Sequence, residues 1–248
     1  MDDGDLARVR GWVQAARSIA VLTGAGVSAE SGVPTFRDAQ TGYWAQFRAE
    51  DMATDAGFRA HPQRVWDWYT HRRALLAHVQ PNAAHRALAG FAQLHPGRLT
   101  LITQNVDGLH QAAGSPDVLA LHGDLCAVRW LDTPQPCCRE DRVSDERPPR
   151  CKVCGNALRP AVVWFGESLP PQVWSQAEAA VRRCDLMLVV GTAGAVHPAA
   201  GLAHTARAAG ARVVIVNPQP SALDALAHCL LRGTAASVLP GVLGEATG

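Results

Sequence analysis

The chain has 248 residues, of which 48% are hydrophobic, and a formal net charge of +1. This length allows one large domain, or a large domain with a small one. The near-zero charge argues against nucleic acid or an anionic membrane as a partner, and no apolar run approaches the ~20 residues of a membrane span. Residues 1–5 are acidic and do not resemble a signal peptide. We therefore expect a cytoplasmic protein whose seven cysteines are thiols or metal ligands.

The spacing of apolar residues predicts helices that alternate with short strands. Helices are expected at 6–17, 61–79, 83–94, 171–183, 198–209 and 234–243. Strands are expected at 18–22, 99–103, 118–121, 185–190, 211–216 and 228–231, with a further extended segment at 158–167. This alternation predicts an α/β fold, with a Rossmann-like parallel sheet that helices cover on both faces.

The first strand runs into a glycine-rich turn at 23–29, Thr-Gly-Ala-Gly-Val-Ser-Ala. Two glycines with Ala29 three residues later fit the G-x-G-x-x-G/A pattern of a dinucleotide site. In such sites the glycines let backbone N–H groups approach a pyrophosphate, and a helix N-terminus adds positive charge. A tight turn without a ligand is the alternative that this pattern alone leaves open.

The residues after this turn are unlike those of a dehydrogenase. Gly32 and Pro34 should end the helix soon after it begins, and Phe36 and Arg37 then place an aromatic ring and a cation near the expected phosphates. The acids at 50–51 lie ~20 residues on, but no strand-like run precedes them. We therefore expect a dinucleotide site that does not serve simple hydride transfer, beside a loop at 38–61 that could act as a lid.

Tyr69 and Arg72 lie three residues apart in the helix predicted at 61–79, so they share one face. A phenol O–H and a guanidinium fork can together hold a carboxylate. The alternative is that Tyr69 packs in a core while Arg72 faces solvent.

Polar side chains follow the strands at 99–103 and 118–121. Gln104, Asn105 and Asp107 come after the first of these, and His122 after the second. Ligands of open parallel sheets bind at the carboxyl ends of strands, where these amides and this carboxylate suit a nucleotide, although they can also cap a helix. A neutral histidine there is a candidate general base. Later strands end in small or polar residues, namely Gly191, Thr192, Ala193 and Asn217.

The segment 124–160 is an insert of different composition that holds five of the seven cysteines. Cys151 and Cys154 have the spacing of half a zinc knuckle. A closed structural site needs four ligands, and a second C-x-x-C pair is absent from the sequence.

Taken together, the motifs at 24–38, 103–110, 121–123, 162–167 and 191–193 resemble those of the sirtuin family of NAD-dependent protein deacylases, over roughly residues 12–243. Within it, the chain resembles the bacterial class III branch that removes acidic acyl groups, because residues 69–72 match that branch's Tyr-x-x-Arg pair. The resemblance implies succinyl-, malonyl- or glutaryl-lysine as the substrate, with acetyl-lysine a poorer one, and NAD as the co-substrate.

The resemblance also implies residue roles. Nicotinamide leaves as the acyl oxygen attacks the ribose, His122 takes a proton from a ribose hydroxyl, Asn105 lines the nicotinamide pocket, and the acyl group ends on ADP-ribose. The implied NAD contacts are Gly24, Ala25, Gly26, Ser28, Gly32, Pro34, Phe36, Arg37, Gln104, Asn105, Asp107, Gly191, Thr192, Ala193, Asn217 and Ala235. The implied substrate contacts are Tyr69, Arg72 and an edge strand for the substrate peptide, Val162, Val163, Trp164 and Phe165.

The chain departs from the family at its zinc site. Trp130 and Thr133 stand where the family has its first cysteine pair. Two alternatives follow. Cys137 and Cys138 could supply the missing ligands, although adjacent cysteines are awkward for one tetrahedral ion, or the insert could be metal-free and held by packing.

The expected division has three parts. A Rossmann-like NAD-binding domain covers 1–37, 81–123 and 161–248, a helical cofactor-loop and acyl-pocket module covers 38–80, and the cysteine-bearing insert covers 124–160. We expect a monomer. The alternatives are a deacetylase without acidic preference, an ADP-ribosyltransferase or NAD hydrolase, and a non-catalytic NAD sensor. An intact peptide-docking segment argues against the hydrolase, and His122 with Asn105 against the sensor.

Overall fold

The computed structural model describes residues 3–33 and 47–244 of the chain. Pro34, Phe36 and Arg37, which the sequence assigns to cofactor binding, lie outside the described residues. Among the helices in this part of the chain, none is long and apolar enough to cross a membrane. All seven cysteines fall within it as free thiols.

The centre of the fold is a parallel sheet with the strand order β3-β2-β1-β6-β7-β8. Its strands in the described residues are β1 (Ile19–Thr23), β2 (Leu99–Thr103), β3 (Leu119–Ala120), β6 (Leu186–Val190), β7 (Arg212–Val216) and β8 (Cys229–Leu231). In register, Ile19 of β1 pairs with Leu99 of β2 and Leu186 of β6. The strand order changes direction between β1 and β6, and open α/β sheets bind ligands at such a switch. The predicted α/β fold is confirmed.

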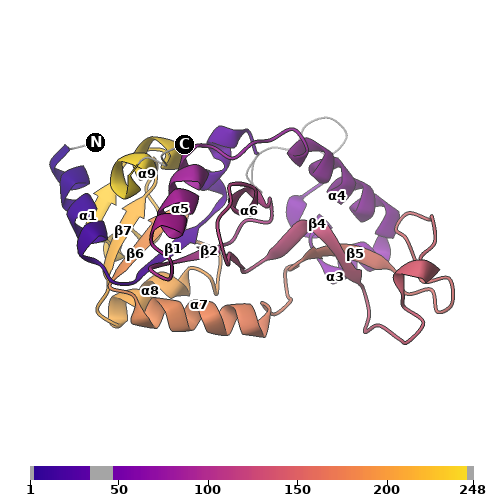
Figure 1. Cartoon of the computed structure of the whole chain (residues 1–248). Coiled ribbons are helices and arrows are strands. Elements are labelled where there is room, and N and C mark those ends of the chain that lie inside the picture. Colours follow the sequence, from indigo (N-terminus) through magenta and orange to yellow (C-terminus); the bar gives the residue numbers. More distant parts are fainter. Residues whose placement is uncertain (1–2, 34–46, 245–248) are drawn as a thin grey trace.

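Helices cover both faces of this sheet (Figure 1). One face carries α1 (Asp3–Ala15), α5 (Ala83–Leu94) and α9 (Ala235–Leu243), and the other carries α7 (Pro171–Arg183) and α8 (Gly201–Ala208). Along β1, Ile19 and Val21 join the first cluster, whereas Ala20 and Leu22 join the second. Because both faces of the strand are buried, its sequence is a continuous apolar run.

A second, smaller core lies at the other end of the molecule (Figure 1). It is built from α2 (Ala49–Met52), α3 (Asp55–Ala60), α4 (Pro62–Leu76) and an antiparallel pair, β4 (Gly123–Trp130) and β5 (Leu158–Val162). Its buried side chains include Phe58, Val65, Trp68, Tyr69, Leu125 and Trp164. The helix predicted at 61–79 is α4, which ends three residues earlier. Described parts of the segments 38–80 and 124–160 thus share one hydrophobic cluster.

Two local predictions differ from the structure. The helix expected after the glycine turn is only a pair of 3-10 turns, η1 (Ala25–Val27) and η2 (Ala29–Ser31), and the second turn ends at Gly32, as expected, with a φ of +86°. The strand β4 was not foreseen, since Leu125 is its one buried residue and no apolar alternation marks it. The remaining short helices in the described residues are α6 (Leu109–Ala112), η4 (Glu140–Arg142) and η5 (Asp224–Leu226).

Candidate active site

Two tight turns meet at the carboxyl ends of β1 and β6. Gly191 has a φ of +61°, and a Cβ atom on it would overlap the backbone nitrogen of Val27 and lie 2.6 Å from the carbonyl carbon of Gly26. A Cβ on Gly24 would lie 2.7 Å from the Cβ of Thr192, and one on Gly26 would lie 2.8 Å from the Cα of Gly191. Any larger residue at these three positions would push the turns apart, which is why all three are glycine.

The N–H groups of the first turn are used differently from the sequence-based expectation. Gly24 and Gly26 donate to the carbonyl oxygens of Val190 and Gly191, at 3.0 and 2.8 Å. These two N–H groups therefore hold the turns together rather than reach out to a phosphate. The absence of Cβ atoms lets the two turns pack in direct contact, and Ala25 is partly exposed beside them. Glycine turns of this kind at strand ends suit the close approach of a dinucleotide pyrophosphate.

Ser28 lies at the centre of a buried polar cluster. Its hydroxyl donates to Oδ2 of Asp107 at 2.7 Å and accepts from Nδ2 of Asn105 at 3.1 Å. The other oxygen of Asp107 accepts the N–H of Leu109, the first residue of α6, at 3.0 Å. The structure therefore brings together Ser28, Asn105 and Asp107, and each holds the next in place.

His85, which the sequence reading did not single out, completes this cluster from α5. The N–H of Asn82, the N-cap of α5, donates to Nδ1 of His85 at 3.3 Å. Nδ1 is therefore unprotonated, and the hydrogen on Nε2 points to Oγ of Ser28, 3.3 Å away. Burial lowers the pKa of His85 to about 4, against the opposing charge of Asp107. The signal in the sequence is a histidine three residues after an asparagine cap, the capping-box spacing.

Gln104 joins three strand ends to the candidate base. Its backbone N–H donates to the carbonyl of Thr23 at 3.0 Å, and its side-chain amide donates to Oγ1 of Thr192 at 3.2 Å. Its carbonyl oxygen lies 2.9 Å from Nδ1 of His122. Because a carbonyl can only accept, Nδ1 carries the hydrogen and Nε2 is the unprotonated nitrogen. Burial lowers the pKa of His122, and the bond to Gln104 only partly opposes this effect. His122 is thus a neutral imidazole of fixed orientation near pH 7, which is the state that a general base requires.

The other residues expected near adenosine lie at the ends of later strands. Asn217 follows β7, and its side-chain amide donates to the carbonyl of Gln219 at 2.8 Å, so that it braces its own turn. Ala193 is exposed beside Thr192. Ala235 is buried as the first residue of α9.

Tyr69 is buried in the small core, and its hydroxyl has a defined partner. The indole N–H of Trp164 donates to Oη of Tyr69 at 3.0 Å. Burial raises the pKa of Tyr69 to about 12, although the charge of Arg72 works in the other direction. Tyr69 is therefore a neutral phenol near pH 7. Since the indole can only donate, the hydroxyl hydrogen of Tyr69 is directed elsewhere.

Arg72 lies one helical turn after Tyr69 and is partly buried. Its guanidinium carbon lies 4.8 Å from the ring centre of Trp68. Burial lowers the pKa of Arg72, against the influence of Tyr69. The alternative was a packed Tyr69 beside a solvated Arg72. Tyr69 is indeed packed in a core, but the guanidinium of Arg72 is also withdrawn from water.

The small core is tied directly to the residues around His122. The N–H of Val163 donates to the carbonyl of His122 at 2.8 Å, and the N–H of Leu125 donates to the carbonyl of Val106 at 2.9 Å. Val106 packs against the small core while its chain neighbours belong to the polar cluster of Ser28. Trp164, which bonds Tyr69, is therefore the chain neighbour of a residue that is hydrogen-bonded to the backbone of His122.

The segment expected to dock a peptide is only partly a strand. β5 ends at Val162, and residues 163–165 continue beyond it. Their N–H groups donate, in order, to the carbonyl of His122, to Oε2 of Glu167 and to the carbonyl of Ala53, at 2.8, 2.8 and 2.9 Å. The N–H groups of residues 163–165 are thus already bonded within the chain, and the carbonyl of Trp164 accepts from the N–H of Glu167 at 3.0 Å.

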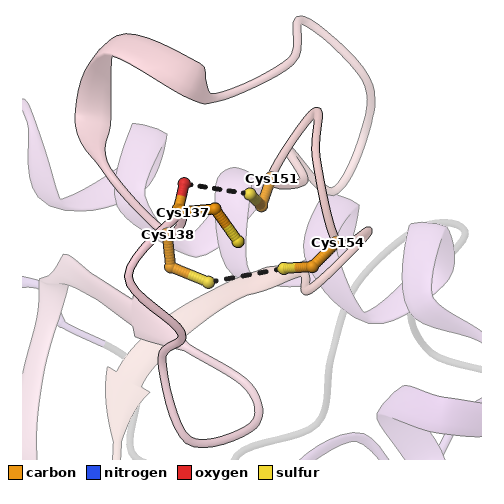
Figure 2. Close-up of side chains that lie close together, drawn as sticks. All are labelled: Cys137, Cys138, Cys151 and Cys154. Carbon is orange, nitrogen blue, oxygen red and sulfur yellow. Dashed lines mark hydrogen bonds between the residues drawn. The ribbon is translucent and has the colours of Figure 1, made fainter.

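Four cysteines from the insert form a compact cluster, shown in Figure 2. The sulfur atoms of Cys137, Cys138, Cys151 and Cys154 all lie within 4.8 Å of one another, and those of Cys138 and Cys154 are 3.5 Å apart. Four thiolates around tetrahedral zinc, with Zn–S near ~2.3 Å, require sulfur separations of about 3.8 Å, so the cluster fits this ion. Adjacency of the first two cysteines does not prevent them from completing the set.

The turn geometry explains how the cluster is held. In the C-x-x-C turn, the N–H of Gly155 donates to the carbonyl of Cys151 at 2.9 Å, with a φ of +76° at the glycine. The N–H of Gln135 points to the sulfur of Cys138 at 3.3 Å, as backbone amides do around metal-bound thiolates.

Comparison with known proteins agrees with this geometry. The model of the Sir2 family matches residues 24–198. A relative from Ralstonia nicotianae, named NAD-dependent protein deacylase, is 55% identical over 96% of this chain and 95% of its own length. NAD-dependent protein deacylase 1 of Pseudomonas aeruginosa is 48% identical over 93% of this chain and 95% of its own length.

Solved structures are similar over the whole fold. The crystal structure of a Sir2 homologue in complex with NAD has a TM-score of 0.85 at 40% identity, covering 98% of this chain and 93% of the other. A complex of Sir2 with a p53 peptide and NAD has a TM-score of 0.80 at 28% identity, covering 98% and 97%. The family match spans well over half of the chain, and the relatives align along nearly all of it. The chain therefore belongs to the Sir2 family.

Proposed function

We propose that this chain, an NAD-dependent protein deacylase of the Sir2 family, prefers lysine acyl groups that end in a carboxylate, such as succinyl, malonyl or glutaryl. The observation that carries the proposal is the pair formed by Tyr69 and Arg72. Both side chains are withdrawn from water on one face of α4, and the bond from Trp164 leaves the phenol hydrogen for another acceptor.

The chemistry of this pair suits a carboxylate better than a methyl group. A partly buried guanidinium and a neutral phenol donor give charge-assisted hydrogen bonds to a carboxylate, which are stronger where water is excluded. An acetyl group ends in a methyl, which offers no charged acceptor to either group, so acetyl-lysine gains none of these bonds. We therefore expect acetyl-lysine to be the poorer substrate.

The residues at the switch of the sheet fit NAD as the co-substrate. The glycine turns that contain Gly24, Gly26 and Gly191 would lie against the pyrophosphate, and Ser28, Asn105 and Asp107 would line the nicotinamide end. When bound, NAD supplies the ribose carbon to which the acyl oxygen is transferred. The residues of the chain hold and orient the reactants, because their hydrogen bonds already fix one another.

His122 would move the proton in this reaction. Its Nε2 is the unprotonated nitrogen, and its Nδ1–H is held by the carbonyl of Gln104. Near pH 7 it can therefore accept a proton from a ribose hydroxyl without first losing one. The same carbonyl would stabilise the protonated ring that results.

Zinc, if held by the four cysteines, would have a structural role. Four thiolates fill a tetrahedral ion and leave no open position for a substrate. The ion would fix the insert, which carries β4 and β5 toward the acyl pocket.

Steady-state turnover of matched succinyl-lysine and acetyl-lysine peptides with NAD tests the proposal. We expect Arg72→Met to lower kcat/KM for the succinyl peptide about 100-fold, the loss of a charge-assisted pair, and to lower the acetyl value much less. Arg73→Met is the matched control. Arg73 is the next residue on α4, where its guanidinium contacts Trp66 and Thr70, so the preference should persist.

Three outcomes would contradict the proposal. A wild type that prefers acetyl, with a preference unchanged by Arg72→Met, is a deacetylase without acidic preference. If Arg73→Met abolishes the preference as fully as Arg72→Met, the effect comes from α4 as a whole. If NAD is consumed without loss of either acyl group, an ADP-ribosyltransferase or NAD hydrolase is the better description.

A further inference from the structure

Arg159 is an unusual residue for its place in the fold. It lies in β5 within the small core and is only 1% exposed. Its guanidinium donates to both carboxylate oxygens of Glu167, to the carbonyl of Val162 at 2.6 Å and to the carbonyl of Pro160 at 3.3 Å. A buried arginine is tolerated only when its charge and its N–H groups are satisfied in this way.

The same guanidinium lies over the ring of Trp164. Its central carbon is 3.3 Å from the centre of the indole ring, and Phe58 contacts the ring with centres 5.4 Å apart. Glu167, the ion-pair partner of Arg159, also accepts the backbone N–H of Trp164 at 2.8 Å. Both the ring and the backbone of Trp164 are therefore held by the Arg159–Glu167 pair.

Trp164 in turn holds the phenol of the acyl pocket. Its indole N–H donates to Oη of Tyr69 at 3.0 Å, and this bond occupies an acceptor position on that oxygen, so that the hydroxyl hydrogen of Tyr69 points away from Trp164. The chain of contacts runs from Glu167 through Arg159 and Trp164 to Tyr69. Each step is a direct hydrogen bond, ion pair or ring contact between buried or half-buried groups.

We propose that the buried Arg159–Glu167 pair is a positioning element for acyl specificity, which fixes the hydroxyl of Tyr69 through Trp164 so that it donates to the carboxylate of the acyl group. This inference rests on the proposed acidic-acyl preference. Neither Arg159 nor Glu167 touches the acyl group. With the pair intact, Tyr69 meets the carboxylate already oriented, which removes an ordering cost on binding.

The competing explanation is that the pair only stabilises the small core. The two explanations differ in what they predict for different substrates. A purely structural defect lowers turnover of every acyl peptide in the same proportion. A positioning defect lowers kcat/KM for succinyl more than for acetyl, mainly through KM, because only succinyl uses the hydroxyl of Tyr69.

The test compares Arg159→Lys, Tyr69→Phe and the double variant on matched succinyl and acetyl peptides. Lysine keeps the charge but not the planar fork or the stack on Trp164. We expect Arg159→Lys to reduce the succinyl-to-acetyl ratio of kcat/KM about tenfold. In the Tyr69→Phe background, the same change should reduce the ratio no further, because the hydroxyl that it acts through is already gone.

Arg129→Lys is the matched control. Arg129 also donates to both carboxylate oxygens of Glu167, each at 3.0 Å, but its side chain is half exposed, whereas that of Arg159 is buried. We expect this variant to keep the wild-type ratio. If Arg159→Lys fails to fold, Glu167→Gln is tested instead. This change keeps the shape of the side chain but removes the charge that holds Arg159. We expect it to reduce the succinyl-to-acetyl ratio of kcat/KM in the same direction, by a smaller factor.

The outcomes separate this inference from the proposed function. If the wild type prefers succinyl and Arg72→Met removes the preference while Arg159→Lys and Glu167→Gln leave the ratio unchanged, the acidic-acyl function stands and the positioning role is refuted. An equal loss on both peptides, or additive losses in the double variant, likewise shows that the pair is structural. If the wild type has no succinyl preference, the proposed function fails and this inference fails with it.

Discussion

The imidazole rings of His85 and His110 lie 4.8 Å apart, centre to centre, with both side chains buried. Nε2 of His110 is 3.0 Å from Oγ1 of Thr23, whose own hydroxyl donates to Oγ1 of Thr103 at 2.8 Å. Nδ1 of His110 is buried without a hydrogen-bond partner among the residues that the structure describes. The pair therefore supports Ser28 on one side and the ends of β1 and β2 on the other, and it does so in the neutral form.

We expect the free energy of unfolding to decrease as the pH falls below 6.5. Burial lowers the pKa of His85 to about 4 and that of His110 to about 3, from 6.5 in the unfolded chain. Between these values the unfolded state binds more protons than the folded state, so acid favours unfolding, by on the order of 1 kcal/mol per pH unit for each histidine.

Urea unfolding at pH 7, 6, 5 and 4.5 measures this slope. His110→Gln should make the slope shallower, although it also lowers stability at pH 7. His78→Gln is the control, since His78 is exposed, and it should leave the slope unchanged. An identical slope in His110→Gln and the wild type would show that the buried pair does not cause the acid sensitivity.

The proposed general base His122 should stay neutral to a lower pH than an exposed histidine does. Burial lowers the pKa of His122 from 6.5, and the base is needed in its neutral form. The acidic limb of the kcat/KM profile for the succinyl peptide should therefore lie below pH 6.5. Nicotinamide release between pH 5 and 8 would show it, and His122→Asn should remove turnover across the range. A limb centred above pH 6.5 would contradict the assigned environment of His122.

Much of this fold follows from the sequence, because the parallel strands are continuous apolar runs between helices. Residues 19–22 and 186–190 are buried on both faces, and such runs leave a clear pattern. β4 leaves none, since it is largely exposed and is defined by pairing with the distant β5. Pairing between distant segments depends on the three-dimensional fold rather than on local spacing.

The residues of the candidate site also differ in whether local sequence patterns predict them. Residues at strand ends, such as Gln104 and His122, were predictable because the carboxyl edge of a parallel sheet gathers them. His85 and Arg159 were not, because their roles consist of contacts with partners that are distant in sequence or hidden in a core. Likewise, nothing in the spacing of Cys137 and Cys138 shows that a loop carries them to the C-x-x-C turn.

The contact between the two glycine turns should tolerate no side chain. In Gly191→Ala, the new methyl group would overlap the backbone of Val27 and Gly26, in a φ region that alanine disfavours. We expect the turns to separate and the Kd for NAD, measured by calorimetry, to rise at least about tenfold, with a lower Tm. Gly201→Ala in α8 is the control, because a Cβ there meets open space. Unchanged NAD binding in Gly191→Ala would show that the close approach of the turns is not needed.

The cluster of four cysteines predicts the zinc content of the protein. The purified wild type should carry about one zinc per chain, the stoichiometry of a site closed by four thiolates. Cys138→Ser should lower both the zinc content and the Tm, because three thiolates no longer close the coordination sphere and the insert loses its anchor. Removal of the metal with a chelator should lower the Tm of the wild type in the same way. At a temperature where the metal-depleted protein is still folded, turnover should fall only slightly, since the ion does not touch the reactants.

Cys126→Ser is the matched control for Cys138→Ser. Cys126 is an exposed cysteine of β4 outside the cluster, so its loss should change neither zinc content nor Tm. Equal zinc loss in Cys126→Ser and Cys138→Ser would mean that the metal sits elsewhere or is bound nonspecifically. A wild type without zinc, even after purification with zinc present, would favour an insert held by packing of side chains such as Trp130. In that case Cys138→Ser should leave the Tm nearly unchanged, because Cys138 is only partly buried.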